Sequence, residues 1–424
     1  MGLNNSTLIN LCEQGNEKKA IMMIDQLGYK CLPGLVDEYG HTSLIWACRT
    51  GLEKVAIMMI DKFEDKCLPE QVDEHGYTAL IWACDNGLEK VAVMMIDKFG
   101  DKCLPGQVNK YRDTALISAC CKDLEEVAIM MIDKFGDKCL PGHIDKYGYT
   151  ALIRICYKGL EKVAIIMIDK FGYKCLPEQV NINRETALIC ACYNGLEEIS
   201  IMMINTFGYK CLPGQVNKYK GTALIWACRK GLEKVAVVMI DQFRDKCLPK
   251  QVNEDGYTAL IYACRKDLEN IAIMMIDKLG DKCLPRQVNK YKDTALIWAC
   301  KKGFETVAIM MIDKFGNRCL PEQVNKNGDT ALILACDKGL ERVAIRMIDK
   351  FGDKCLPEQV NEYRDTALIS ACRKGFEKVA IRMIDKFGNI CLPEQVDKHG
   401  NTALTWAYNT GLEKVIDQMQ PYVR

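Results

Sequence analysis

Histidine is scarce in this chain of 424 residues, and that scarcity limits the chemistry the chain can support. There are four histidines, all in predicted turns and none beside a candidate nucleophile: His41, His75, His143 and His399. Acidic residues recur at regular intervals, as they do on solvated helix faces, whereas an active site is a unique constellation. We therefore expect no enzymatic activity, no catalytic residues and no cofactor.

The sequence also lacks long apolar runs and an excess of charge of one sign. No apolar stretch approaches the ~20 residues that a membrane-spanning helix needs. The N-terminus has no basic segment followed by an apolar core, which would mark an export signal. The net charge is +1, far from the basic balance typical of nucleic-acid binders. We expect a cytoplasmic protein with no membrane and no nucleic-acid partner.

Cysteine, by contrast, is abundant. Of the 24 cysteines, 22 form two series that repeat in phase, with alternating spacings of 19 and 17 residues. These spacings do not supply the short paired intervals of a zinc site. Disulfides would need an oxidising compartment, for which there is no export signal. We expect free cysteines that serve as small buried hydrophobes, and no metal site.

One pattern of 36 residues fills almost the whole chain. The stretch 78–113 reads TALIWACDNGLEKVAVMMIDKFGDKCLPGQVNKYRD, and its opening threonine recurs every 36 residues from Thr42 to Thr402 without insertion or deletion. A weaker copy opens at Ser6, which makes twelve copies. A fixed period of this size predicts a solenoid, in which each unit buries its faces against its neighbours.

Each copy predicts two helices. Thr78 is placed to cap a first helix over 79–84, and Gly87 stands where a helix ends in a left-handed conformation. The apolar residues of 88–99 fall on one face of a second helix. The proline in Leu104-Pro105-Gly106 then breaks the chain, because it lacks an N–H and restricts φ.

These residues resemble the ankyrin repeat, whose usual form reads T-P-L-H-x-A-A, two residues, Gly and then a second helix. The pattern T-A-L-I-W-A-C-x-x-G-L-E-x-V-A-x-x-M-I and the lead-in D/N-x-x-G-x-T carry the resemblance over essentially all 424 residues. Here Ala replaces Pro, Ile replaces His, and each unit is three residues longer than the common ~33. The extra residues lie in the K-C-L-P-E-Q segment. The amino-acid pattern of the repeat also resembles repeat arrays of large DNA viruses of amoebae. This resemblance implies that the protein is located in the host cytoplasm.

We therefore expect an all-α, ankyrin-type helix-turn-helix solenoid that occupies residues 1–424 as a single domain. Residues 1–36 form an N-terminal cap repeat, because Asn16 and Lys19 replace the recurring Leu and Val. Residues 37–396 form ten internal repeats, and 397–424 form a truncated C-terminal cap repeat. We expect caps at both ends, no appended catalytic or DNA-binding domain, and a monomer.

The resemblance implies that a partner contacts the turn tips and the ends of the first helices, along the concave side. The third residue before each threonine supplies a series of tyrosines: Tyr39, Tyr111, Tyr147, Tyr219, Tyr291 and Tyr363. Tyrosine offers a large rigid area with a polar tip, which suits a contact surface. The alternative is that each ring only packs against the neighbouring turn.

A second series follows the first helix and is basic: Arg229, Lys230, Arg265, Lys266, Lys301, Lys302, Arg373 and Lys374. Cations are favoured at a helix C-terminus by ~0.3–1 kcal/mol each, which is one explanation. The same position holds Asp85 and Tyr193 elsewhere, however, so the helix end does not require a cation. The other explanation is a surface for a partner protein with an acidic face.

Three functions remain open. The leading hypothesis is a non-enzymatic protein–protein interaction scaffold that binds along the concave face and the turn tips. An adaptor for host ubiquitin ligation is the second, although the chain contains no recognisable ligase-docking motif. A structural spacer without a specific ligand is the third, and near-identical units from internal duplication would suit it.

Overall fold

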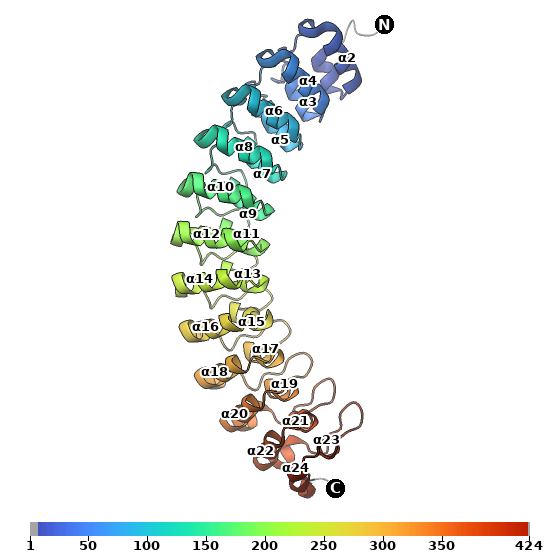
Figure 1. Ribbon diagram of the computed structural model, residues 1–424, viewed down its shortest axis with the longest axis vertical. Helices are drawn as coiled ribbons and strands as arrows, with labels where there is room; N and C mark the ends of the chain where they lie inside the picture. Colours follow the sequence, from blue (N-terminus) through green and yellow to red (C-terminus); the bar gives the residue numbers. More distant parts are fainter. Residues whose placement is uncertain (1–6, 423–424) are drawn as a thin grey trace. The chain divides into compact units, whose positions relative to one another are not determined.

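The computed structural model describes residues 7–422. The chain divides into two compact units, Met1–Leu212 and Pro213–Arg424, which are described separately. Within each unit, helices alternate between two layers, one of first helices and one of second helices (Figure 1). Apart from two isolated bridges, residues 7–422 form no strand. The predicted all-α solenoid of paired helices is confirmed, while its extent as a single domain over 1–424 stays a prediction.

Unit 1, described from residue 7, contains six helix pairs, each followed by a short 3₁₀ helix. The first helices are α1 (Leu8–Glu13), α3 (Ser43–Arg49), α5 (Ala79–Asp85), α7 (Ala115–Cys121), α9 (Ala151–Lys158) and α11 (Ala187–Asn194). The second helices are α2 (Glu17–Leu27), α4 (Glu53–Phe63), α6 (Glu89–Phe99), α8 (Glu125–Phe135), α10 (Glu161–Phe171) and α12 (Glu197–Phe207). The 3₁₀ helices are η1 (Gly28–Cys31), η2 (Glu64–Cys67), η3 (Gly100–Cys103), η4 (Gly136–Cys139), η5 (Gly172–Cys175) and η6 (Gly208–Cys211).

Unit 2, described to residue 422, repeats this arrangement. Its first helices are α13 (Ala223–Lys230), α15 (Ala259–Arg265), α17 (Ala295–Lys302), α19 (Ala331–Asp337), α21 (Ala367–Arg373) and α23 (Ala403–Thr410). Its second helices are α14 (Glu233–Phe243), α16 (Glu269–Leu279), α18 (Glu305–Phe315), α20 (Glu341–Phe351), α22 (Glu377–Phe387) and α24 (Glu413–Met419). The 3₁₀ helices are η7 (Arg244–Cys247), η8 (Gly280–Cys283), η9 (Gly316–Cys319), η10 (Gly352–Cys355), η11 (Gly388–Cys391) and η12 (Gln420–Tyr422).

The predicted helix ends are confirmed. The Thr78 hydroxyl accepts the N–H of Ile81 at 3.2 Å, which satisfies one of the free donors at the start of α5. After α5, Gly87 takes a φ of +71°, a conformation open to glycine because it has no Cβ. Helix α6 then buries one apolar face, including Val91 and Phe99.

Stacking of the pairs builds the core of each unit. Helix α5 packs against α3 and α7, and α6 packs against α4 and α8; in unit 2, α17 packs likewise against α15 and α19. The buried cysteines belong to this core: 23 are buried and Cys121 is half-buried. Burial raises the pKa of the Cys103 thiol to about 12, so it stays protonated and unreactive. The prediction that the two repeating series of cysteines are buried is confirmed.

The lengthened K-C-L-P-E-Q segment begins inside an element that the sequence did not predict, the 3₁₀ helix η3. Gly100 leaves the α-helix with a φ of +54°, and the chain continues as the 3₁₀ helix η3. Cys103 then turns its Sγ inward, 3.3 Å from the carbonyl oxygen of Met95. Leu104 ends η3 in the left-handed region with a φ of 50°. The lengthened part of the repeat thus begins with a 3₁₀ turn that directly follows the second helix.

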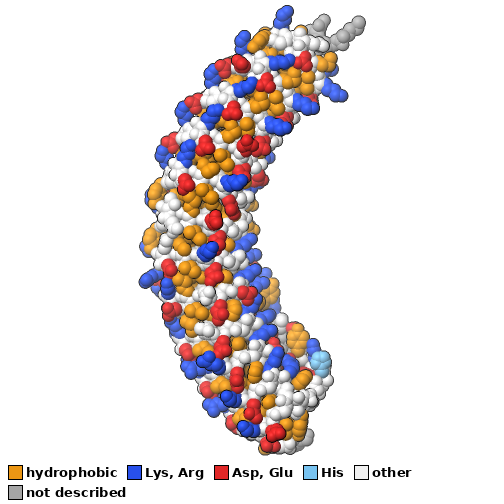
Figure 2. Space-filling view, in the orientation of Figure 1, with side chains coloured by type: hydrophobic (Ala, Val, Ile, Leu, Met, Phe, Trp, Pro, Cys, Tyr) orange, Lys and Arg blue, Asp and Glu red, His pale blue; other side chains and the backbone are white. Residues whose placement is uncertain are grey.

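The second-helix face of each unit carries regularly spaced ion pairs between successive repeats. The Lys98 ammonium lies 2.5 Å from Asp61, and Lys134 lies 3.0 Å from Asp97, in each case 37 residues apart. Lys and Arg therefore alternate with Asp and Glu on this face (Figure 2). Each exposed pair of this kind contributes little to the stability of the fold.

Among residues 7–422, no helix is both long and apolar enough to cross a membrane.

In unit 1, the predicted polar substitutions lie at the N-terminal end of α2. The Asn16 side chain accepts the N–H of Lys19 at 3.3 Å and so caps this helix, and the Lys19 side chain is exposed. At the equivalent position of a later repeat, Leu88 precedes α6, and its apolar side chain makes no capping hydrogen bond. Asn16 therefore strengthens the end of a helix pair that has no neighbour upstream among the described residues.

Candidate functional site

The turns that precede the first helices position the variable side chains. In the turn before α5, Asp73 Oδ1 accepts the N–H groups of His75 and Tyr77, both at 2.9 Å. The carbonyl oxygen of His75 in turn accepts the N–H of Lys110 from the next repeat at 2.7 Å. The same pair of interactions recurs along each unit, so neighbouring turns are held in register and their tips form a row.

The predicted tyrosines lie at these tips. Their exposed fractions range from 38% for Tyr111 to 49% for Tyr39. Lysines flank the rings: the Lys290 and Lys326 ammonium groups lie 5.4 and 5.6 Å from the centre of the Tyr291 ring. The rings therefore pack against neighbouring turns, as one interpretation held, and also keep the exposed area that the other requires.

A second set of side chains lies four residues after each threonine and faces these turns. Where this residue is tryptophan and the turn begins with aspartate, the indole donates to the carboxylate. Trp82 Nε1 lies 3.1 Å from Asp73 Oδ2, and Trp406 Nε1 lies 2.9 Å from Asp397 Oδ2. Burial opposes ionisation of Asp397, yet N–H donors from Asn401, Trp406 and His399 outweigh it, so the pKa of Asp397 lies below its usual value.

Two smaller residues at this position open a cavity in unit 2. Leu334 and Ser370 stand where Trp298 and Trp406 stand in the flanking repeats. The space between them is a cavity of about 530 Å³, bounded by Tyr363 and by the Trp406 ring. The Ser370 hydroxyl is buried and, among the described residues, has no hydrogen-bond partner. This cavity is a shaped recess that the sequence pattern did not reveal.

A second cavity of about 180 Å³ adjoins the first. It is lined by Arg265, Tyr291 and Trp298, and it shares Lys301 and Asn327 with the larger cavity. The two cavities therefore form one depression between the turn tips and the ends of the first helices. We call this surface, from Arg265 on α15 to Trp406 on α23, the groove face of unit 2.

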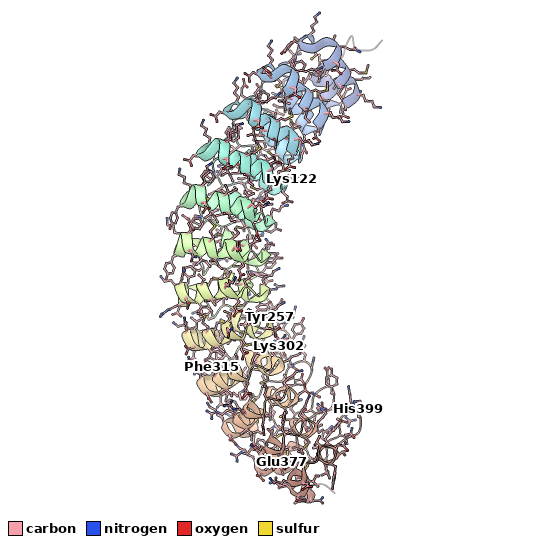
Figure 3. The ribbon with its side chains drawn as sticks, in the orientation of Figure 1. Lys122, Tyr257, Lys302, Phe315, Glu377 and His399 are labelled. Carbon is pink, nitrogen blue, oxygen red and sulfur yellow. The ribbon has the colours of Figure 1, made fainter. Side chains whose placement is uncertain are left out.

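The structure separates the predicted basic series into two rows. Arg265, Lys301 and Arg373, seven residues after the threonine, are half-buried and line the groove face. The residues one position further on are exposed and line neither cavity: Lys230, Lys266, Lys302 and Lys374. Lys302 lies at the end of α17 on the first-helix side of unit 2 (Figure 3). Arg229 is also exposed, with its guanidinium 4.8 Å from the centre of the Trp226 ring.

Acidic residues pair with part of this series, which the sequence interpretation did not foresee. Arg373 donates to both oxygens of Asp365, at 2.9 and 3.0 Å, and lies 3.5 Å from Asp337. Lys302 lies 2.9 Å from Asp267. Asp365 directly precedes a repeat-opening threonine, at a position that varies among the copies, so this variation was the available signal. The groove face is therefore not basic throughout.

Unit 1 carries an acidic site on its corresponding face. Burial, together with the nearby carboxylates of Asp145 and Asp85, raises the pKa of Asp113 to about 6. Arg154 donates to Asp145 at 2.8 Å and lies over the Tyr149 ring.

Within residues 7–422, no group of three or more His, Cys, Asp or Glu side chains is placed to hold a metal ion.

Comparison with known proteins gives one family. The family model "Ankyrin repeats (3 copies)" matches residues 4–105 and 204–287. No curated protein matches the chain. The matched stretches include the helix pairs α1/α2, α3/α4 and α5/α6 of unit 1 and the pairs α13/α14 and α15/α16 of unit 2.

Proposed function

Because this chain is an ankyrin repeat protein, we propose that it binds a partner protein along the groove face of unit 2, without catalysing a reaction. Ankyrin repeats are in general protein–protein interaction modules, and their solenoids are in general not catalytic. The finer proposal concerns where on this chain the partner binds. We also propose that the protein acts as a monomer in the cytoplasm.

The observation that carries the proposal is the depression formed by the two joined cavities. Its walls come from five successive repeats, from Arg265 to Trp406, and its volume reaches about 530 Å³ in the larger part. Binding sites are usually concave and combine apolar walls with a few polar groups. Leu334 and the Trp406 ring supply the apolar walls here, and Ser370 supplies a buried hydroxyl.

The exposed tyrosines support the same surface. Tyr291 borders the smaller cavity and Tyr363 the larger one, so the rings stand at the edge of the depression. Aromatic side chains beside a pocket are frequent anchors of protein interfaces. The remaining members of the tyrosine series, Tyr39, Tyr111, Tyr147 and Tyr219, stay predictions for the partner contact.

The test fills the larger cavity with a side chain that the fold already accepts. Tryptophan occupies the equivalent position in neighbouring repeats, so the variant Leu334→Trp/Ser370→Trp should fold while closing the recess. Ser118→Trp makes the same kind of change in unit 1 and serves as the matched control. Circular dichroism establishes that each variant keeps its helices.

Partners captured from lysate on the wild-type chain are then titrated against purified variants. We expect saturable binding to the wild type and to Ser118→Trp, and loss of binding by Leu334→Trp/Ser370→Trp. A folded double variant that binds every partner as tightly as the wild type would refute the groove face of unit 2 as the binding site. A wild-type chain that captures no partner would favour the spacer hypothesis.

A further inference from the structure

The smaller cavity of the groove face carries an excess of positive charge. Three cations border it: Arg265 from α15, Lys301 from α17, and Lys326 from the next turn. Its one acidic residue, Asp293, is buried. The Asp293 carboxylate already accepts hydrogen bonds from two side-chain amides, that of Asn289 at 3.3 Å and that of Asn325, in the next turn, at 3.0 Å. The carboxylate inside the cavity is therefore satisfied by neutral donors.

The cations form no close ion pair, although Lys301 is near enough to Asp329 to offset part of the rise that burial causes in the pKa of that carboxyl group. Among residues 7–422, no carboxylate lies within 4.0 Å of Arg265, Lys301 or Lys326. Arg373 is the contrasting case in the larger cavity, because Asp365 accepts two of its hydrogen bonds. The smaller cavity is thus the part of the groove face where an incoming negative charge would find cations that are not already in a close ion pair.

Two of these cations are held over the same indole ring. The Arg265 guanidinium lies 5.5 Å from the centre of the Trp298 ring, and the Lys301 ammonium lies 5.0 Å from it. Arg265 is further oriented by donating to the hydroxyl of Tyr257 at 2.7 Å. Tyr257 itself is buried, at the end of the turn that precedes α15 (Figure 3). A neutral hydroxyl fixes the guanidinium without neutralising its charge.

The indole beneath them lacks the carboxylate that its equivalents have. Trp298 Nε1 is buried without a hydrogen-bond partner among the described residues. The turn before it begins with Asn289, whereas the turns before Trp82 and Trp406 begin with aspartates that accept the indole N–H. In those two repeats, the indole therefore lies next to a carboxylate that the chain itself supplies from the preceding turn.

We propose that the partner supplies this negative charge: a glutamate or aspartate side chain of an extended acidic segment binds in the smaller cavity, between Arg265 and Lys301. The proposal rests on the proposed function and adds the chemistry of the partner. Charge-assisted hydrogen bonds to a carboxylate are among the stronger polar contacts, and Arg265 presents its donors in a fixed fork. Tyr291, at the turn tip, borders the same cavity and covers the segment from the side.

The probe is a peptide of four Gly-Ser-Glu units that carries an uncharged fluorophore. In an extended chain its glutamates recur about every 10 Å, which matches the interval of about 10 Å between helices of successive repeats. Fluorescence anisotropy measures its affinity for the full-length chain. We expect saturable binding by the wild type and none when every glutamate is replaced by glutamine.

The variant Arg265→Gln/Lys301→Gln should weaken binding of this peptide about tenfold or more, equivalent to ~1.4 kcal/mol. The matched control, Lys266→Gln/Lys374→Gln, removes the same charge from exposed cations outside the cavity and should change the affinity less than about twofold. The charge-retaining variant Arg265→Lys/Lys301→Arg should lose less affinity than Arg265→Gln/Lys301→Gln, because it keeps both charges but loses the guanidinium fork at position 265.

Equal losses in the two glutamine variants would overturn the proposal, because they would indicate attraction by net charge alone. A wild-type chain that does not bind the peptide, or that binds an oligothymidylate of equal charge more tightly, would also overturn it. These failures are separate from failure of the proposed function. A partner that is lost by Leu334→Trp/Ser370→Trp but unaffected by Arg265→Gln/Lys301→Gln would keep the groove face and reject the carboxylate.

Discussion

The buried hydrogen bond between Trp82 and Asp73 connects a turn to the first helix that follows it. The indole N–H lies 3.1 Å from Asp73 Oδ2, while Asp73 Oδ1 accepts two backbone N–H groups of the turn. The Asp73 side chain is fully buried. The substitution Asp73→Asn would keep the Oδ1 contacts and place an amide donor against the indole donor.

The magnitude follows from the charge of the acceptor. A hydrogen bond to a charged group contributes ~1.5–3 kcal/mol, and leaving a buried donor without an acceptor costs a similar amount. We therefore expect Asp73→Asn to lower the free energy of unfolding by about 2 kcal/mol. His41 Nε2 also lies 3.5 Å from the Asp73 carboxylate, so a single substitution does not isolate the pair.

A double-mutant cycle isolates it. Asp73→Asn, Trp82→Phe and the double variant are compared with the wild type by urea unfolding, followed by circular dichroism. The contact with His41 is lost equally in both backgrounds and cancels in the cycle. We expect a coupling free energy of about 1.5–3 kcal/mol. A coupling below about 0.5 kcal/mol would show that the two substitutions act independently and would refute this reasoning.

Three further predictions concern other positions. Because the pKa of Asp113 is raised to about 6, its carboxyl group favours the folded state most when protonated, and this contribution is lost as the pH rises from about 4 through 6. Asp113→Asn should therefore raise the melting temperature at pH 7–8 and not at pH 4; an equal rise at both pH values would contradict this. Arg112 takes a left-handed φ of 63°, so Arg112→Gly should stabilise the protein by about 1 kcal/mol in urea unfolding. Gly256→Arg makes the reverse change at the equivalent position of another repeat and should destabilise the protein, because the new Cβ would lie 2.7 Å from the carbonyl oxygen of Val288. If both substitutions changed the free energy of unfolding in the same direction, the proposed backbone strain would be refuted. Native cysteines should react slowly with a thiol reagent, and half-buried Cys121 should react first, so loss of the fastest phase in Cys121→Ser is the check.

Much of the fold could be predicted from the sequence because its causes are local. The Thr78 cap, the positive φ of Gly87 and the apolar face of 88–99 each depend on residues within one repeat, and all three are confirmed. The 36-residue period then requires each helix pair to stack on the next. The 3₁₀ helix Gly100–Cys103 was not predicted, because a segment of four residues has no periodicity to detect.

The candidate site was predictable only in part. Variation among the copies indicated the turn tips and the ends of the first helices, and the exposed tyrosines and the half-buried Arg265 and Lys301 lie there. From the sequence, the basic residues were interpreted as one row. It could not separate Arg373, paired with Asp365, from the unpaired Arg265, because the two have the same residue type and the same phase.

The sequence by itself determined the number of repeats, the two helices in each and the burial of the cysteines, since hydrophobic periodicity and capping act over a few residues. Only the tertiary structure decided where the groove face opens and which of its cations are unpaired. Those properties depend on side chains from different repeats, such as Arg265 over Trp298, and on the space left beside Ser370 by a missing ring. The physical reason is that a cavity or an ion pair is a distance between residues far apart in the chain, and a repeat pattern specifies residue types without specifying those distances.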